Sequence, residues 1–385
     1  MKLVCTQRAL AEGLAIVDRA VPTKSPLPVL SNVLLATEGG RLKLVGNNLE
    51  MAITTWVPAD VAEEGSVTLP ARLLSDFVSS LTAGDVSMEL RPGTKTVKLK
   101  AGRYEANVNG VDAEDFPSVP SVEGGGHCAV SAKVLREGIM QAAFAAATDE
   151  TRPVLSGVLV TIEGDQLTLA AADGFRLAVR TISLDEPVEE AMSLLVPSRT
   201  LKELARILED SDELVDIAAT PNRNQIMFQY YGESKSPLPK LLVVSRLIEG
   251  QFPDYQRIIP QGFQTRVVLR TDEFQRAAKT ASVFSRDNSN IVRISVTPGH
   301  ELVPGSVEVT ATSAEMGDNL GQLDGSVDGE QIEIAFNVRY LAEALEAISG
   351  ESVALEITGP TSPGLLKPAA SGDHLHVIMP MHVAR

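Results

Sequence analysis

The segment LSNVLLATEGGRLKL, residues 30–44, recurs 125 positions later as LSGVLVTIEGDQLTL, residues 155–169. The two segments are identical at eight of fifteen positions without a gap. The match extends upstream in the same register, where TQRALAEGL (6–14) aligns with SAKVLREGI (131–139). Thr6 and Ser131 are predicted N-caps, because the apolar residues that follow them have helical spacing. The chain therefore repeats a unit that starts with a short strand and a helix.

A second predicted helix occurs three times, in VTLPARLLSDFVSSL (67–81), LLVPSRTLKELARIL (194–208) and IAFNVRYLAEALEAI (334–348). Arg72, Arg199 and Arg339 occupy the same point of each copy, 127 and 140 residues apart. Alternating segments such as RLKLVG and VEVTAT, bounded by turn residues, predict antiparallel strands between the helices. We therefore predict an α+β fold of three repeated domains, at 1–125, 126–262 and 263–385, each with two helices packed on antiparallel sheets.

The charge is unevenly distributed along the 385 residues. The chain has a net charge of −16, which by itself would count against a nucleic-acid partner. The predicted helices, however, carry eleven basic and nine acidic residues, so they sum to +2 and the rest of the chain to −18. Single charged residues on a helix usually face solvent, and gene duplication alone can enlarge a protein. The threefold recurrence of an arginine at a helix start instead favours equivalent surfaces around an axis, in contact with a phosphate backbone.

Other features of the composition restrict the class of protein. Cys5 and Cys128 are the only cysteines, which fits a reduced, cytoplasmic setting, and the N-terminus predicts neither a signal peptide nor a membrane span. Two histidines, at positions 374 and 376, would share one face of a strand, but no further ligands with metal-site spacing accompany them. Catalytic motifs are also absent from the sequence. We predict no catalytic residues, no bound metal and no cofactor.

Seven segments in order carry a resemblance that covers the whole chain: SPLPVLSNVLL (25–35), LPARLLSDFVSSL (69–81), TRPVLSGVL (151–159), ADGFRLAV (172–179), SRLIEGQFPDYQRIIP (245–260), FNVRYLAEAL (336–345) and VIMPM (377–381). The chain resembles the beta subunit of bacterial DNA polymerase III, the sliding clamp. The resemblance implies a head-to-tail homodimer whose six DNA-clamp domains form a ring, with the helices lining a central hole. Such a ring encircles and slides on duplex DNA as the processivity factor of the replicative polymerase.

The resemblance also implies two sets of site residues. The DNA contacts match Lys24, Arg72, Arg152, Arg199 and Arg206. A groove for short peptides of the DNA polymerase III catalytic subunit, the clamp loader, and other clamp-binding polymerases and repair proteins matches Leu155, Ala172, Gly174, Phe175, Arg176, Leu177, Pro253, Arg257, Ile258, Asn337, Tyr340, Val377, Ile378, Met379, Pro380 and Met381. Ala172 and Phe175 stand where clamps vary. Without the resemblance, VIMPM is interpreted as a last strand buried in its own domain.

Three further hypotheses concern the edges and loops of the chain. The segment 94–108, with Lys95, Lys98, Lys100 and Arg103, is predicted to be a basic edge strand for ring closure, although lysines also protect ordinary sheet edges. Residues 122–128 are interpreted as a linker, and residues 234–240 and 360–374 as lengthened loops. The alternative function is an acidic scaffold that binds only proteins and does not encircle DNA.

Overall fold

The computed structural model describes residues 1–25, 27–119, 127–149, 151–232, 238–285, 289–300, 304–313 and 317–382. The predicted linker at 122–128 and the predicted loop at 234–240 lie mainly outside these residues. The chain divides into two compact units, Met1–Arg136 with Glu203–Leu247 (unit 1) and Glu137–Lys202 with Ile248–Arg385 (unit 2).

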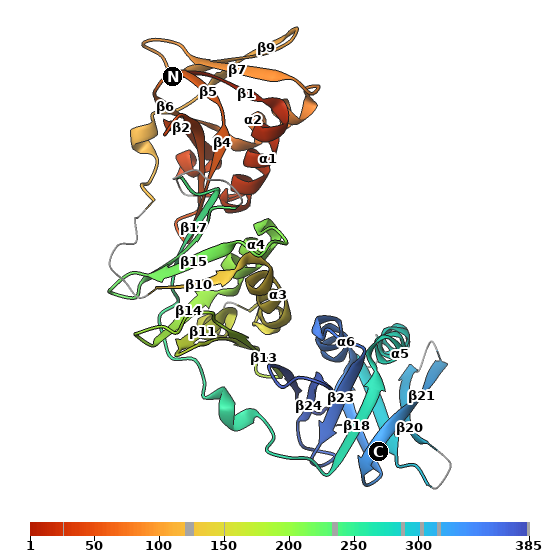
Figure 1. Ribbon diagram of the computed structural model, residues 1–385. Helices are drawn as coiled ribbons and strands as arrows, with labels where there is room; N and C mark the ends of the chain where they lie inside the picture. The colour runs from red at the N-terminus through yellow and green to blue at the C-terminus, as the bar shows by residue number, and fades with distance from the viewer. Residues whose placement is uncertain are drawn as a thin grey trace. The chain divides into compact units, whose positions relative to one another are not determined.

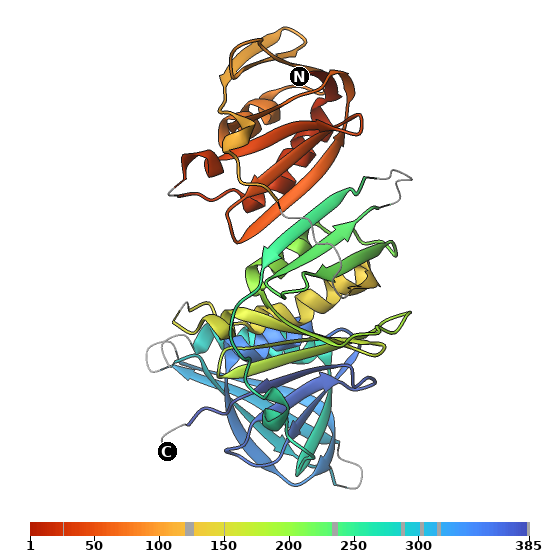
Figure 2. The same ribbon diagram turned by 90° about the vertical axis from the view of Figure 1, so that its left-hand side faces the viewer.

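Unit 1 contains two sheets. The five-stranded sheet has the order β5 (Asp60–Glu63), β1 (Lys2–Thr6), β7 (Asp85–Leu90), β8 (Thr96–Ala101), β9 (Tyr104–Asn109). The eight-stranded sheet has the order β10 (His127–Ser131), β15 (Leu214–Ala219), β16 (Gln225–Tyr230), β17 (Leu241–Arg246), β4 (Met51–Pro58), β3 (Arg41–Asn47), β2 (Asn32–Glu38), β6 (Ser66–Pro70). Figure 2 shows β15, β16 and β17 running side by side in green. Helices α1 (Gln7–Val17) and α2 (Ala71–Ser80) pack together, and α1 covers β3 and β4 (Figure 1).

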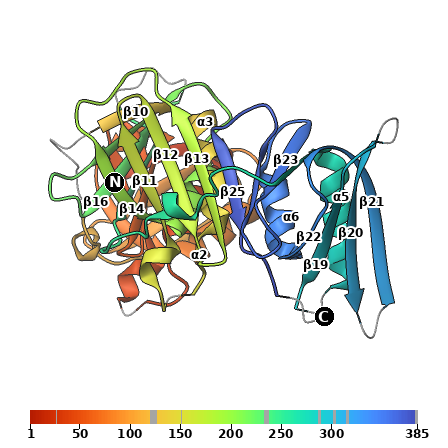
Figure 3. The same ribbon diagram turned by 90° about the horizontal axis from the view of Figure 1, so that it is seen from below.

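Unit 2 contains one continuous sheet of twelve strands. Its order is β14 (Met192–Pro197), β11 (Gly157–Glu163), β12 (Gln166–Ala172), β13 (Arg176–Ser183), β25 (His374–Ile378), β24 (Gly364–Pro368), β23 (Ser352–Ile357), β18 (Thr265–Arg270), β21 (Gly317–Gly329), β20 (Gly305–Ser313), β19 (Ile291–Thr297), β22 (Ile332–Asn337). Helices α5 (Thr271–Phe284) and α6 (Val338–Ala347) pack side by side against it (Figure 3). Helices α3 (Ala132–Ala142) and α4 (Ser198–Ile207) each cross the division between the units.

The structure confirms the predicted repeat of strand and helix. Ala9 N donates to Thr6 Oγ1 and Val134 N to Ser131 Oγ, each at 3.3 Å, so both predicted N-caps are present. Arg72, Arg199 and Arg339 are each the second residue of their helix, in α2, α4 and α6. The three recurrent arginines therefore occupy equivalent helix starts.

Repeated helical glycines mark close packing of a helix on a strand. A Cβ atom at Gly13 would lie 2.6 Å from a methyl of Val57, and one at Gly138 would lie 2.6 Å from Ile182 Cδ1. Val57 and Ile182 are themselves 125 positions apart. An alanine at either glycine would require these strand side chains or the helix to shift, which explains why a residue with poor helix propensity recurs there.

Two predictions from the sequence were wrong in detail. The segment 94–108 is a hairpin of β8 and β9, not one strand, because Gly102 adopts a left-handed turn between them. The lysines of β8 already have partners, since Lys98 lies 3.0 Å from Glu105 on β9. The segment 360–374 is not simply a loop, because Gly364–Pro368 forms β24 between β23 and β25, with Leu365 and Leu366 buried. Flanking Pro and Gly residues hid this short apolar strand.

Two strand pairings in the chain are copies of one another. In unit 1, β17 pairs with β4 so that Ser245 lies opposite Met51. In unit 2, β25 pairs with β13 so that Ile378 lies opposite Arg176 (Figure 3). These two pairings join the second repeat to the first and to the third. They also explain why the chain forms two compact units although it has three repeats.

The two junctions also close with equivalent hydrogen bonds. Arg246 N donates to Glu50 O at 2.8 Å, and Met379 N donates to Phe175 O at 2.9 Å. Glu50 and Phe175 are separated by the repeat distance of 125 residues. The same register therefore connects neighbouring repeats twice within one chain.

In the described part of the chain, no helix is both long and apolar enough to cross a membrane.

Candidate functional site

An apolar cluster forms on the outward face of the β13–β25 junction. Leu177 and Val377 lie directly opposite each other in this pairing, and both are buried. Ala172 at the end of β12 belongs to the same cluster, and Leu155 on the 3-10 helix Pro153–Ser156 packs against it. The predicted peptide-groove residues from the second repeat and from the C-terminal strand therefore come together around one apolar surface.

The rim of this cluster contains exposed apolar side chains. Phe175 is 57% exposed and Met379 40% exposed, although the backbones of these two residues are hydrogen-bonded to each other. Gly174 precedes Phe175 with φ of +95°, a conformation that glycine adopts at little cost. The next residues of the chain are also fixed, because Met381 N donates to Ala335 O at 2.8 Å. Large, solvent-exposed apolar side chains beside a buried apolar floor are typical of a binding surface.

Arg176 is held at the edge of the site by several contacts. Its guanidinium lies 4.6 Å from the ring of Tyr340 and 5.2 Å from the ring of Phe144. Arg176 Nε donates to Asp173 Oδ2 at 3.0 Å, and a second guanidinium nitrogen pairs with Glu343 of α6. The side chain is 11% exposed, so these contacts fix one conformation. Arg176 thus connects β13 with α6 and keeps a positive charge beside the apolar surface.

The remaining predicted groove residues are placed differently. Asn337 caps α6, because its Oδ1 accepts from Arg339 N at 2.9 Å. Ile378 faces the core of the third repeat. Arg257 and Ile258 lie on the exposed 3-10 helix Tyr255–Ile258, where Arg257 pairs with Asp254 at 2.8 Å. Pro253 follows Phe252, a member of the cluster, and Pro380 follows the exposed Met379.

Several residues of the cluster were missed by the sequence analysis. They are Val154, Leu159, Ala170, Val179, Leu195, Ile248, Phe252, Tyr255, Ile259, Leu365 and Leu375. The strand members were predictable from alternation, since Val179 and Leu375 lie two residues from Leu177 and Val377. Phe252 and Tyr255 lie in the quoted segment SRLIEGQFPDYQRIIP, where two aromatic residues close in sequence were the available signal. In the structure their ring centroids are 6.4 Å apart. Leu365 was hidden by the wrong loop assignment.

The predicted DNA contacts are exposed side chains, and they are divided between the two units. Lys24, Arg72 and Arg206 belong to unit 1, and Arg152 and Arg199 belong to unit 2. Arg72 is 96% exposed, with Asp76 at 3.9 Å. Arg206 pairs with Glu203 at 2.6 Å, and Glu203 also binds Arg19 at 2.8 Å. In the described residues Arg199 has no ion-pair partner, so its full charge is available to an anionic ligand.

The His374–His376 pair lies on the opposite face of β25 from the apolar cluster. Both rings are buried, and their centroids are 4.4 Å apart. Burial, together with the nearby Arg180 guanidinium, lowers the pKa of His374 from 6.5 to about 4. Burial also lowers the pKa of His376 well below 6.5. Among the described residues, no group of three or more His, Cys, Asp or Glu side chains could hold a metal ion.

This pair predicts a pH-dependent stability. We expect the free energy of unfolding to fall as pH decreases from 6.5 to 4, because His374 takes up a proton in the unfolded chain but stays neutral in the native one. A pKa difference of this size corresponds to about 3 kcal/mol. Denaturant titrations from pH 7 to pH 4 measure the effect. The variant His374→Leu should show a flatter pH dependence, and an unchanged slope would contradict the assignment.

Comparison with known proteins covers nearly the whole chain. Family models of the DNA polymerase III beta subunit match residues 1–120 (N-terminal domain), 129–254 (central domain) and 256–382 (C-terminal domain). The beta sliding clamp of Synechococcus elongatus is 34% identical over 389 residues and is covered fully, as is this chain. The beta sliding clamp of Bacillus subtilis is 29% identical, with 99% of each chain covered.

Solved structures give the same result. The crystal structure of the DNA polymerase sliding clamp from Bacillus subtilis has a TM-score of 0.91 at 29% identity, with both chains covered fully. A sliding clamp from Pseudomonas aeruginosa bound to griselimycin has a TM-score of 0.89 at 30% identity, again with full coverage. The fold and the site thus define a clamp protein built from three α+β domains. The chain belongs to the DNA polymerase III beta subunit family, the beta sliding clamps, which confirms the resemblance found in the sequence.

Proposed function

We propose that this chain acts as a processivity clamp in which two copies close head to tail around duplex DNA. The repeated strand junction carries this proposal. Each chain contains two complete junctions, β17 with β4 and β25 with β13, and the unpaired partners of a third. In the described sheets β9 is an outermost strand, and β18 pairs only with the last part of β21, at Ser326–Gly329. The first part of β21 therefore leaves one backbone edge open.

The internal copies predict the register of the missing junction. The pairs β8–β9, β16–β17 and β24–β25 are equivalent hairpins of the three repeats. Ala106, Val243 and His376 occupy the same position in them. The pairs β20–β21, β3–β4 and β12–β13 are likewise equivalent hairpins. Asn319, Ile53 and Ala178 occupy the same position in them. Val243 pairs with Ile53 and His376 pairs with Ala178. Ala106 should therefore lie opposite Asn319 of a second copy.

A heterologous contact of this kind gives a closed ring if the rotation closes, and otherwise an open filament. In the proposed dimer each copy contributes β9 to one interface and β21 to the other. The helix starts with Arg72, Arg199 and Arg339 would then recur around the ring, and Arg72 and Arg199 would contact the DNA backbone without reading its sequence. The proposed DNA contacts remain Lys24, Arg72, Arg152, Arg199 and Arg206. The acidic remainder of the chain disfavours DNA on other surfaces.

The apolar cluster at the β13–β25 junction is the proposed groove for peptides of the polymerase, the clamp loader and other clamp-binding proteins. The copy of this junction in unit 1 supports the choice. There the outward positions equivalent to Leu177 and Val179 are Ala52 and Thr54, which provide a smaller and more polar surface. Exposed Met379 can adapt its side chain to related ligands. The proposed domains remain 1–125, 126–262 and 263–385, and the protein is proposed to be non-catalytic, without a cofactor, and cytoplasmic.

Retention on DNA tests the proposed encirclement. The protein, loaded on nicked circular DNA by its clamp loader, should remain bound after a rise in salt and should leave after a single cut that linearises the circle. We expect at least a tenfold longer residence on the circle, since a closed ring is held by topology and not by salt-sensitive phosphate contacts. Equal loss from circular and linear DNA would overturn encirclement, and failure to load would support the acidic scaffold instead.

A further inference from the structure

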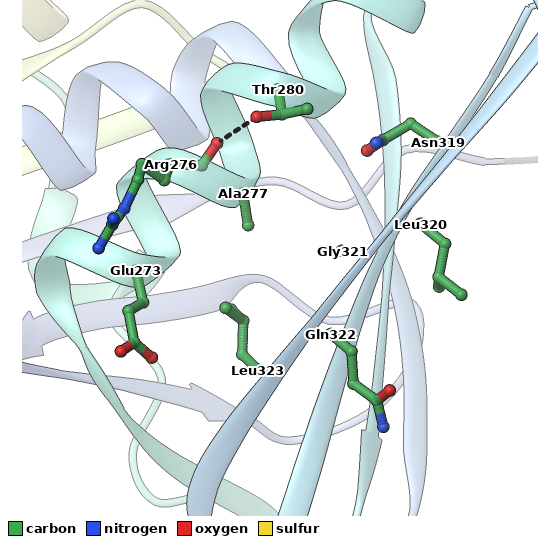
Figure 4. Close-up of a pocket in the computed structure, with 9 residues that line it drawn as sticks. All are labelled: Glu273, Arg276, Ala277, Thr280, Asn319, Leu320, Gly321, Gln322 and Leu323. Atoms are coloured by element: carbon green, nitrogen blue, oxygen red, sulfur yellow. Dashed lines mark hydrogen bonds between the residues drawn. The ribbon is translucent and has the colours of Figure 1, made fainter.

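The hollow between α5 and β21 lies at the open edge of β21. It has a volume of about 390 Å³ and is lined by one face of α5 and by Asn319–Leu323 (Figure 4). Gly321 lies at its centre, and a Cβ atom built there would be 3.5 Å from Ala277 Cβ of α5. Leu320 and Gln322 point away from α5 in Figure 4, because side chains alternate along a strand. The hollow exists because glycine provides no side chain at an inward-facing position.

The edge strand β9 of unit 1 carries a large side chain that is less buried than its neighbours on the same face. Val108 is buried and Ala106 is half-buried, and both face the core of the first repeat. Tyr104 shares their face, since it lies two residues from Ala106, but it is 60% exposed. A tyrosine ring can bury about 150–250 Å² when it is covered, so this exposure leaves considerable apolar surface in water.

The register derived from the internal junctions places the tyrosine of one copy beside the hollow of another. If Ala106 lies opposite Asn319, then Tyr104 lies opposite Gly321, on the same face of the combined sheet. The pair is also a close one. Arg246 N bonds Glu50 O, so these two residues form a hydrogen-bonded pair at the end of the β17–β4 ladder. Hydrogen-bonded and non-hydrogen-bonded pairs alternate along an antiparallel ladder. The pair equivalent to Tyr104–Gly321 lies an odd number of residues from Arg246 along β17, so it is a non-hydrogen-bonded pair. Side chains approach most closely at such pairs.

We propose that Tyr104 of one copy inserts its ring into the α5–β21 hollow of a second copy, over Gly321, and thereby selects this edge as its partner. The proposal rests on the ring closure proposed above and adds its anchor. An aromatic ring that covers a glycine across a strand pair is a known stabilising arrangement. Thr280 and Arg276 at the wall leave a polar place for the phenol hydroxyl.

The two internal junctions support a second copy as the occupant. The positions equivalent to Tyr104 are Leu241 and His374, and they are only 3% and 2% exposed. Both are covered by the neighbouring hairpin, opposite Thr55 and Arg180. The same position on β9 is exposed because a single chain supplies no third hairpin to it. The hairpin with the matching register is that of β20 and β21, in another copy.

Substitutions on each side of the contact test the proposal. Gly321 does not have a positive φ, and its Cβ position has only ordinary contacts, so Gly321→Leu should fold while it fills the hollow. We expect Gly321→Leu and Tyr104→Ala each to raise the dimer dissociation constant at least 30-fold, measured by sedimentation equilibrium. Tyr104→Phe should stay within threefold of the unsubstituted protein, because the ring is retained. Circular dichroism and thermal unfolding verify the fold of each variant.

The double variant provides the decisive comparison. Tyr104→Ala removes the ring that Gly321→Leu would clash with, so the double variant should dimerise at least tenfold more tightly than Gly321→Leu alone. Additive losses, or an unchanged dimer in Gly321→Leu, would overturn the Tyr104 contact and leave the ring closure standing. A protein that is monomeric without any substitution would overturn both proposals. A cysteine pair at Ala106 and Asn319 should cross-link between copies, and failure to do so in a stable dimer would reject the register.

Discussion

The variant Asn107→Pro should convert the proposed ring into monomers. Gly110 N donates to Lys95 O, which lies just before β8. Backbone N–H groups alternate in direction along a strand, so those of Val108 and Ala106 point to β8 and that of Asn107 points to the open edge. Proline removes this donor and places a ring where the second copy would pair. The loss of one ladder bond with its acceptor left unpaired costs about 1–3 kcal/mol, before any clash.

The loss of binding free energy occurs twice in each dimer, because a head-to-tail dimer has two identical interfaces. A loss of about 2 kcal/mol at each interface corresponds to roughly a 1000-fold weaker dimer. Sedimentation equilibrium measures the dissociation constant, and retention on circular DNA should fall in parallel. Asn107→Ala is the matched control, since it shortens the same side chain but keeps the N–H. If both variants dimerise equally well, β9 does not use its open edge for pairing.

The second large effect is expected at the apolar cluster of the β13–β25 junction. Leu155→Asp places a charge at the border of this cluster without emptying its buried floor of Leu177 and Val377. Binding of a fluorescent peptide copied from the clamp-binding segment of the polymerase should weaken about 30- to 100-fold, because truncation of an apolar anchor costs about 2–3 kcal/mol. Fluorescence anisotropy measures the affinity.

A matched control separates this effect from a general response to added charge. Leu73 on α2 is 53% exposed and belongs to unit 1, whereas the cluster belongs to unit 2, so Leu73→Asp makes the same chemical change in a different unit. Its peptide affinity should stay within about twofold, and both variants should remain dimeric. Equal peptide binding by Leu155→Asp and the unsubstituted protein would place the peptide site on another surface.

Native cysteines should not interfere with thiol-based versions of these experiments. Cys5 and Cys128 are both buried, and burial raises the pKa of each thiol to about 12. The thiolate, which is the reactive form, is therefore scarce at neutral pH. Cross-links between introduced cysteines consequently report the contact between copies and not the cysteines already present.

The repeat could be recognised in the sequence because each helix and strand has a buried and an exposed side. This imposes a periodic pattern of apolar and polar residues, and the copies have kept that pattern after duplication. The N-caps at Thr6 and Ser131 and the helix starts at Arg72, Arg199 and Arg339 were all predicted at the right places. Each depends on interactions within a few residues. The strand β24 was missed because Pro and Gly around a two-residue apolar core resemble a loop when its neighbours are unknown.

The sequence by itself determined that three α+β units recur, that their helices are less acidic than the rest of the chain, and which family the chain resembles. Only the tertiary structure decided which strands join the repeats, that Arg176 lies between Phe144 and Tyr340, and that Tyr104 and Gly321 lie on two open edges. The reason is physical. Periodicity along a chain records which face of an element is buried, whereas strand pairing across more than a hundred residues depends on backbone edges that carry no signal in the side chains.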